Sequence, residues 1–346
     1  MIKNTIKRTI ALTSAAAIIL TAACGCSSDK GASAVSASDE SNSENYEEVT
    51  MILDWTPNTN HTGIYVADQL GYYEEAGIKV NIEMPANGVS SQLVGAGKGE
   101  FGISNQENVT YARSLDDPMP IKSIAAIISH NTSGFVSLSS SNIDSPADWG
   151  QKTYGGYGGT TEIAIVKKIA SDYGVDPDTI NFVELGDADA ITSLQNGIDF
   201  MWVYEGAELI TFEENGIDYN YLPLRDFGDE YDYYTPVIIA NTDYTDANSD
   251  IAAAFVKATQ KGYEYAIENP DDAAQILLSA VSDLDENTTI KSQLYLSQKY
   301  AEDATMWGWQ EDDVWQRYAT FLEDNGLLGG QISIDGAYTN EYLPKE

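Results

Sequence analysis

The regular alternation of strand-like and helix-like segments between residues 49 and 240 constrains the fold of this 346-residue chain most strongly. Residues 49–53 read as a strand, 63–70 as a helix, 79–83 as a strand and 90–96 as a helix. Strands that alternate with helices in this way are typical of an α/β protein. We therefore expect α/β architecture rather than a helical bundle or an all-β domain.

The alternating strands and helices form two sets along the chain. The second set spans residues 135–223, a strand-like segment at 237–240 then leads back to the first set, and residues 250–328 are mostly helical. The chain therefore crosses between the sets twice, near 130–136 and near 233–238. Two independent α/β domains in series would be the alternative, but the tail contains too little strand to form its own sheet.

This plan predicts a two-lobed fold of the type II periplasmic binding protein kind, with a ligand cleft between lobes that close by hinge motion and a helical C-terminal tail. Lobe 1 is assigned to residues 49–134 plus 236–346, and lobe 2 to residues 135–235.

The N-terminus carries a targeting signal. Lys3, Lys7 and Arg8 form a basic start, and residues 9–23 are small and mostly apolar. Such a segment is too short to span a bilayer as a helix and is typical of a secretory signal peptide. Residues 1–23 are therefore predicted to be a signal peptide, and the mature protein is expected outside the cytoplasm.

The two cysteines of the chain, Cys24 and Cys26, follow this signal directly. The sequence around Cys24 resembles a bacterial lipoprotein processing site, which implies a lipid anchor on Cys24 and attachment to the outer face of the cell membrane. Cys26 is the other candidate, and an ordinary signal peptide with two incidental cysteines is the alternative. Residues 24–48 are polar and rich in Ser, Asn, Asp and Glu, which predicts a flexible tether.

Composition excludes several classes of function. The chain has 54 acidic and 18 basic residues and a net charge of −36, which argues against nucleic-acid binding. The sequence has no Gly-x-Ser-x-Gly elbow and no Walker loop, and both cysteines precede the folded part. His61 and His130 are far apart and lack the ligand spacing of a zinc site. We expect a protein that is not an enzyme and that holds neither a metal nor a cofactor.

A first group of candidate ligand-binding residues follows the first strand. Asp54, Trp55, Asn58 and His61 lie at the carboxyl end of that strand, where open α/β sheets bind their ligands. A flat aromatic side chain beside hydrogen-bonding groups suits a flat, polar heterocycle. A Trp that caps the core and a His that caps the following helix are the structural alternatives.

A second group lies in a glycine-rich turn. Gly156, Tyr157, Gly158 and Gly159 run from a strand into a helix that begins near Thr160. Free backbone N–H groups at such a helix start would hold an oxyanion, a formyl oxygen or a hydroxyl group. A tight turn with a threonine as helix cap is the alternative.

A third group follows other strands. Tyr204 and Glu205 come directly after a buried strand, and a carboxylate at this position would pair with a protonated ring nitrogen. Tyr157 and Tyr234 are candidate aromatic walls, and Gln106 and Glu107 begin a helix after a strand, where they would face the cleft. A solvated loop acid is the alternative for Glu205.

Several of these segments resemble the thiamine-pyrimidine family, which contains transport receptors and pyrimidine synthases and is related to sulfonate- and nitrate-binding proteins. The segments that carry the resemblance are 53–61 with 71–78, 95–102, and 155–159 through 197–199 to 204–206. The resemblance implies a monomeric receptor for an ABC importer, which binds an aminopyrimidine (formylaminopyrimidine or hydroxymethylpyrimidine) and docks on a membrane permease. Riboflavin, a sulfonate or another small heterocycle is the alternative ligand.

The chain departs from the synthases at the positions that carry their chemistry. The resemblance places their cofactor-binding Lys at Ser104, their reactive His at Asn108 and their cysteine-rich iron motif near residues 231–235. The synthases also hold a phosphate at the glycine-rich turn, with a Lys where this chain has Thr160. These departures favour the receptor and an uncharged ligand.

Overall fold

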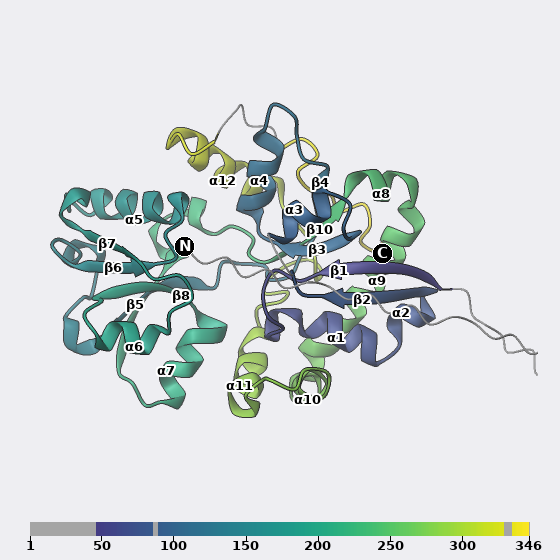
Figure 1. Cartoon of the computed structure of the whole chain (residues 1–346), viewed down its shortest axis with the longest axis horizontal. Helices are drawn as coiled ribbons and strands as arrows, with labels where there is room; N and C mark the ends of the chain where they lie inside the picture. The colour runs from purple at the N-terminus through teal and green to yellow at the C-terminus, as the bar shows by residue number, and fades with distance from the viewer. Residues whose placement is uncertain (1–45, 86–88, 329–333, 346) are drawn as a thin grey trace, which may run out of the picture. The chain divides into compact units, whose positions relative to one another are not determined.

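The computed structural model describes residues 46–85, 89–328 and 334–345 (Figure 1). The expected signal peptide, Cys24 and nearly all of the expected tether lie outside the described residues. The described residues form one compact unit, which contains two five-stranded sheets.

The first sheet has the strand order β2-β1-β3-β10-β4. Its strands are β1 (Glu47–Ile52), β2 (Ile78–Glu83), β3 (Phe101–Ser104), β4 (Ile121–Ala126) and β10 (Val237–Asn241). Strand β1 is parallel to β2 and β3, whereas β10 is antiparallel to both of its neighbours. Strand β1 begins two residues before the expected start, because Glu47 and Glu48 pair with Ile78 and Lys79. Strand β10 lies between β3 and β4 in this sheet, which confirms the expected strand that returns to the first set.

Helices cover both faces of the first sheet (Figure 1). They are α1 (Thr62–Gln69), α2 (Tyr72–Glu75) and α9 (Ser249–Glu268) on one face, and α3 (Ser90–Gly95) and α4 (Gln106–Ser114) on the other. Because side chains alternate along a strand, Met51 packs in the cluster with α1 and α9, whereas Ile52 packs in the cluster with α3 and α4. Helices α1 and α9 approach closely at Gly262, where an added Cβ would lie 1.9 Å from the carbonyl oxygen of Gly63.

The second sheet has the order β7-β6-β8-β5-β9. Its strands are β5 (Ser133–Leu138), β6 (Thr153–Gly156), β7 (Asn181–Glu184), β8 (Phe200–Tyr204) and β9 (Tyr219–Pro223). Helix α5 (Thr160–Asp172) covers one face, and α6 (Ala190–Gln195) and α7 (Ile210–Glu214) cover the other (Figure 1). Phe135 and Phe200 face α5, and their neighbours Val136 and Met201 face α6 and α7.

The C-terminal region is helical, as expected. It contains α8 (Thr242–Ala247), α10 (Pro270–Ala280), α11 (Glu286–Leu296) and α12 (Asp312–Asp324). Helix α12 contacts both halves of the unit, because Tyr318 and Leu322 join the core of the second sheet and Trp315 joins a core of the first. The assignment of residues 236–346 to lobe 1 therefore does not describe all the packing of α12.

Short helical turns connect the main elements. They are η1 (Thr59–His61), η2 (Ser139–Ser141), η3 (Pro146–Asp148), η4 (Pro177–Thr179), η6 (Leu224–Phe227), η7 (Asp229–Tyr231) and the π-helical turn η5 (Glu205–Leu209). Across the described ranges, no helix has both the length and the apolar character that a membrane span requires.

The two chain segments that cross between the sheets are bonded to each other. His130 Nδ1 lies 2.6 Å from Asp232 Oδ2, and His130 Nε2 lies 2.9 Å from Asp303 Oδ1. The backbone N–H of Asn131 donates to Asp232 Oδ1 at 2.8 Å, and its side-chain amide donates to the carbonyl oxygen of Tyr231 at 3.0 Å. The crossing region is thus tied together by hydrogen bonds between residues about 100 positions apart in the sequence.

Candidate functional site

The carboxyl end of β1 presents an exposed Trp beside a fixed carboxylate. Trp55 is 48% exposed, and Asp54 next to it bonds through Oδ1 to His61 Nε2 at 2.9 Å. His61 is fully buried, and its Nδ1 accepts the backbone N–H of Asn58 at 3.2 Å. The ring proton is therefore on Nε2 and is donated to Asp54. Asn58 caps η1 by accepting the N–H of Asn60.

His61 and Asn58 were both expected near the ligand, and the structure gives each of them a local bonding role. Both ring nitrogens of His61 have protein partners, so its contribution is to hold the Asp54 carboxylate in place. Of this group, Asp54 and Trp55 are the two side chains that are exposed to solvent.

The carboxyl ends of β6 and β8 present two exposed tyrosines. Tyr157 is 63% exposed and Tyr204 is 46% exposed. Burial of its hydroxyl raises the pKa of Tyr204 to about 12, and the charges of Glu208, Asp54 and Glu107 add to this shift. The Tyr204 side chain is therefore half exposed, while its hydroxyl is shielded from solvent. Because Asp54 and Glu107 belong to the first sheet's strand ends, the strand ends of the two sheets face each other at Tyr204.

Glu107 lies in the first turn of α4 and is largely enclosed. Its Oε2 accepts the hydroxyl of Tyr318 at 2.7 Å, and burial raises its pKa despite hydrogen bonds from Tyr318 and Thr161. Beside it, the hydroxyl oxygens of Tyr111 and Thr161 lie 2.5 Å apart. Since Thr161 belongs to α5 and Tyr111 to α4, helices from both halves of the unit meet here.

Gln106 and Tyr234 were expected to line the cleft, but both are buried and bonded within the protein. Gln106 Nε2 donates to the carbonyl oxygen of Val314 at 3.1 Å, and its Oε1 accepts the backbone N–H of Tyr234 at 2.9 Å. The Tyr234 hydroxyl accepts the N–H of Glu311 at 2.9 Å. Their side chains join the segment before β10 to α4 and α12, which leaves neither at the exposed strand ends.

Glu205 has two partners from within the chain. Its Oε1 accepts the hydroxyl of Tyr221 at 3.0 Å, and its Oε2 accepts the hydroxyl of Tyr295 from α11. Burial raises the pKa of Glu205, and the hydrogen bond from Tyr221 opposes that shift. No local pattern indicates these partners, because Tyr221 and Tyr295 are 16 and 90 residues away in the sequence. Each oxygen has one tyrosine partner and retains a second lone pair, so a ligand that pairs with Glu205 would share the carboxylate with Tyr221 and Tyr295.

The backbone N–H groups of the glycine-rich turn were expected to be free, and this expectation is wrong. The N–H groups of Tyr157, Gly158 and Gly159 all donate to the carboxylate of Glu162, at 2.9–3.0 Å. Sequence reasoning missed Glu162, although an acid three residues after a helix cap is a known capping signal. Thr160 follows as the first residue of α5 and is exposed.

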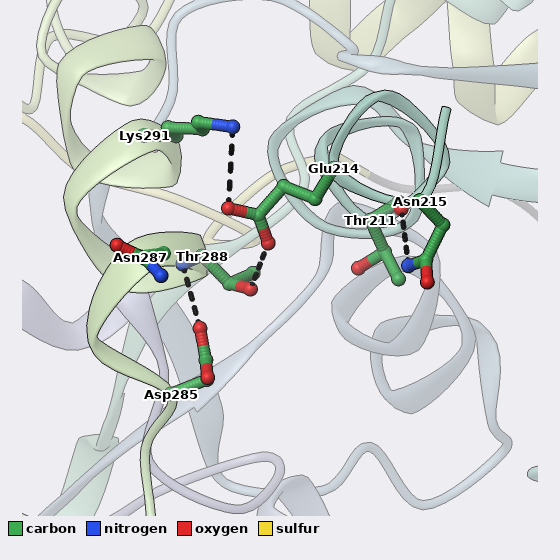
Figure 2. A pocket seen from close by; sticks show the side chains of 7 residues that line it. All are labelled: Thr211, Glu214, Asn215, Asp285, Asn287, Thr288 and Lys291. Atoms are coloured by element: carbon green, nitrogen blue, oxygen red, sulfur yellow. Dashed lines mark hydrogen bonds and ion pairs between the residues drawn. The ribbon is translucent and has the colours of Figure 1, made fainter. Parts of the chain in front are cut away.

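A separate surface hollow of about 630 Å³ lies between α7 and α11 (Figure 2). Glu214 occupies its centre, where it bonds to Lys291 at 3.2 Å and to the Thr288 hydroxyl at 2.5 Å. Its lining residues are polar and include none of the sequence-predicted site residues. Among the described residues, no group of three or more His, Cys, Asp or Glu side chains is arranged to hold a metal ion.

Two mixed sheets with flanking helices, strand ends that face each other and a helical C-terminal region define the fold of the periplasmic solute-binding proteins. The structure of a putative sulfonate ABC transporter protein, the periplasmic sulfonate-binding protein SsuA from Methylobacillus flagellatus KT, has this fold with a TM-score of 0.66. It is 15% identical, and the similarity covers 86% of this chain and 93% of that one.

The model of the NMT1/THI5-like family matches residues 58–273, and the chain belongs to this family. The formylaminopyrimidine-binding protein of Halalkalibacterium halodurans is 29% identical over 307 residues, which are 87% of this chain and 92% of the relative. The 4-amino-5-hydroxymethyl-2-methylpyrimidine phosphate synthase of Legionella pneumophila is 27% identical over 86% of this chain and 92% of the relative.

Proposed function

We propose that this protein is the extracytoplasmic ligand-binding component of an ABC importer and captures a thiamine-related aminopyrimidine, either formylaminopyrimidine or hydroxymethylpyrimidine. The observation that carries the proposal is the exposed Trp55 beside the fixed Asp54 carboxylate, opposite Tyr204 of the second sheet. The family and the formylaminopyrimidine-binding relative support the same ligand class.

The geometry suits a flat ring with an amino substituent. The ring would stack on Trp55, and Asp54 would accept a hydrogen bond from the exocyclic amine, since His61 already fixes the carboxylate. Tyr204 and Tyr157 would cover the ring from the second sheet. A ring nitrogen that pairs with Glu205 would share this carboxylate with the hydroxyls of Tyr221 and Tyr295.

Calorimetry against formylaminopyrimidine, hydroxymethylpyrimidine, thiamine, riboflavin and an alkanesulfonate tests this proposal. We expect one of the two pyrimidines to bind at least tenfold more tightly than the other classes, which corresponds to about 1.4 kcal/mol. Tight binding of riboflavin or the sulfonate without pyrimidine binding would show that the receptor serves a different ligand.

A pyrimidine synthase is the second candidate, because one relative carries that name. We propose that this chain lacks the activity, since Ser104 and Asn108 stand where the resemblance places the reactive Lys and His. Ser104 is 3% exposed, and its hydroxyl has no partner among the described residues. Incubation of the purified protein with pyridoxal phosphate and iron should give no pyrimidine product, and any such product would overturn the assignment.

We also propose that the mature protein is a monomer held at the outer face of the cell membrane by a lipid on Cys24, and that it delivers its ligand to a membrane permease. Mass spectrometry of the membrane fraction tests the anchor. Cys24→Ala should release the protein into the medium, whereas Cys26→Ala should leave it in the membrane fraction. The reverse result would assign the lipid to Cys26.

A further inference from the structure

The glycine-rich turn before α5 surrounds one carboxylate with donors. Glu162 Oε1 accepts the N–H of Tyr157 at 3.0 Å and the hydroxyl of Tyr154 at 2.5 Å. Its Oε2 accepts the N–H groups of Gly158 at 2.9 Å and Gly159 at 3.0 Å. Consecutive backbone N–H groups at the start of a 13-residue helix attract a negative charge. Here that charge comes from the chain itself.

The backbone of the turn is shaped to admit this carboxylate. A Cβ on Gly156 would lie 1.9 Å from Glu162 Oε1, so any side chain at that position would force the carboxylate out. The position is therefore compatible with Gly and with no larger residue while Glu162 stays in place. Both oxygens of Glu162 have two donors each, which leaves none of these N–H groups for a second anion.

Glu162 also belongs to the region where the strand ends meet. Its charge acts on Glu107 and on the hydroxyl of Tyr154, and Tyr154 in turn interacts with Tyr204. The neighbouring Thr161 touches Tyr111 from the other half of the unit. A ligand between Trp55 and Tyr204 would therefore bring one end close to this turn.

We propose that Glu162 is a specificity-determining residue that acts as a fixed internal anion and restricts the site to pyrimidines without a phosphate group. This inference rests on the proposed function. A phosphate at this end of the ligand would have to compete for N–H groups that are already taken and would approach a like charge, which costs binding free energy. A neutral hydroxymethyl or formylamino substituent meets neither obstacle.

Calorimetry with hydroxymethylpyrimidine and its phosphate monoester tests the inference in the wild-type protein and in Glu162→Gln. The Gln amide retains the shape but presents N–H donors to the N–H groups of Gly158 and Gly159, so the side chain should leave the turn. We expect wild-type protein to bind the alcohol at least 100-fold more tightly than the monoester. In Glu162→Gln this ratio should fall at least tenfold through tighter monoester binding, with the alcohol changed less than threefold. An unchanged ratio would contradict the proposal.

Glu184→Gln is the matched control. The Glu184 side chain lies beside the same turn, since its Cγ would be 2.7 Å from a Cβ on Gly158. The Glu184→Gln substitution removes one negative charge at nearly the same place, and it leaves the N–H groups of the turn bonded to Glu162. If Glu184→Gln lowers the ratio as much as Glu162→Gln does, the effect is one of general charge and the specific role of Glu162 is wrong.

Inorganic phosphate provides a test that does not depend on the pyrimidine. In Glu162→Ala, phosphate at matched ionic strength should raise Tm relative to chloride, and it should leave wild-type Tm unchanged. Equal shifts in both proteins would refute the internal anion. If no pyrimidine binds wild-type protein, the proposed function fails while this result still decides the role of Glu162. Circular dichroism confirms that each variant is folded. If Glu162→Ala does not fold, the phosphate-dependent Tm shift is measured in Glu162→Gln instead.

Discussion

At the scale of single residues, the unusual feature is a large aromatic side chain that the fold leaves in water. Trp55 is 48% exposed two residues after the fully buried Leu53, whereas Trp149, Trp307 and Trp315 are almost completely buried. Since the fold buries these three tryptophans, a shortage of hydrophobic core does not explain the exposure of Trp55. The adjacent Asp54 is held by His61, so both groups are positioned before any ligand arrives.

Trp55→Ala should weaken pyrimidine binding at least tenfold, because the ligand loses a stacking partner worth about 0.5–1.5 kcal/mol in addition to the buried area. The free energy of unfolding should change by less than about 0.5 kcal/mol, since the side chain is largely exposed. Calorimetry and chemical denaturation measure the two quantities.

Tyr173→Ala is the control for this variant. Tyr173 is a similarly exposed aromatic, 46% accessible, at the far end of α5. Its removal should leave the affinity unchanged. Equal affinity of Trp55→Ala and wild-type protein would contradict the placement of the ligand on the indole ring.

At the scale of elements, α11 contacts both halves of the unit, because the Ser292 hydroxyl lies 2.6 Å from that of Thr59 in η1 and the helix also bonds to the second half. Tyr295 donates to Glu205, Ser292 donates to the carbonyl oxygen of Gly206 and Lys291 pairs with Glu214. Residues three to four positions apart project from the same side of a helix, which explains why one helix reaches η5 and α7 together. Some of these bonds are buried and others are exposed, so they differ in energetic weight.

Ser292→Ala should lower the free energy of unfolding by about 1–2 kcal/mol, because the buried Thr59 hydroxyl loses its partner at 2.6 Å. Lys291→Ala should lower it by less than about 0.5 kcal/mol, because the lysine side chain is 50% exposed and the pair is screened by solvent. Urea denaturation of both variants decides the matter, and equal losses would show that burial does not govern the contribution of this helix face.

The elements that sequence patterns predicted best are those with regular spacing. Alternation predicted both sheets and the return strand near 237–240, and a Trp and an Asp after the first strand marked the exposed end of β1. Contacts between distant segments could not be predicted, because Tyr295 carries no local signal that it bonds to Glu205. Gln106 has the polarity of a ligand contact, and its burial beside Tyr234 depends on tertiary packing alone.

At the scale of the whole molecule, the chain holds its two halves together where it crosses between the sheets. His130 contacts Asp232 on the return crossing and Asp303 in the C-terminal region. The hydrogen bond to Asp232 is the main cause that raises the pKa of His130 to about 9, and Asp303 adds to it. With a carboxylate on each ring nitrogen, the imidazole is doubly protonated at neutral pH.

His130→Gln should therefore lower stability in a pH-dependent way. A group whose pKa is raised on folding stabilises the protein fully below its unfolded value of 6.5, and this contribution is lost as pH rises through about 9. The difference in unfolding free energy between wild type and His130→Gln should be largest near pH 6 and smallest near pH 10, measured by urea denaturation at about four pH values.

Lys79→Ala provides the comparison, because Lys79 pairs with Glu48 and keeps its charge across most of this range. Its effect on stability should change little between pH 6 and pH 9. If the difference in unfolding free energy between wild type and His130→Gln is constant with pH, the charge of His130 does not hold the crossing segments together.

We propose that an aminopyrimidine binds where the strand ends of the two sheets face each other. A crystal structure of the protein with formylaminopyrimidine tests it most directly. We predict the ring stacked on Trp55, the exocyclic amine bonded to Asp54 and the formylamino group towards the glycine-rich turn that Glu162 caps. A pyrimidine bound in the hollow between α7 and α11, with Trp55 still exposed to solvent, would contradict the account.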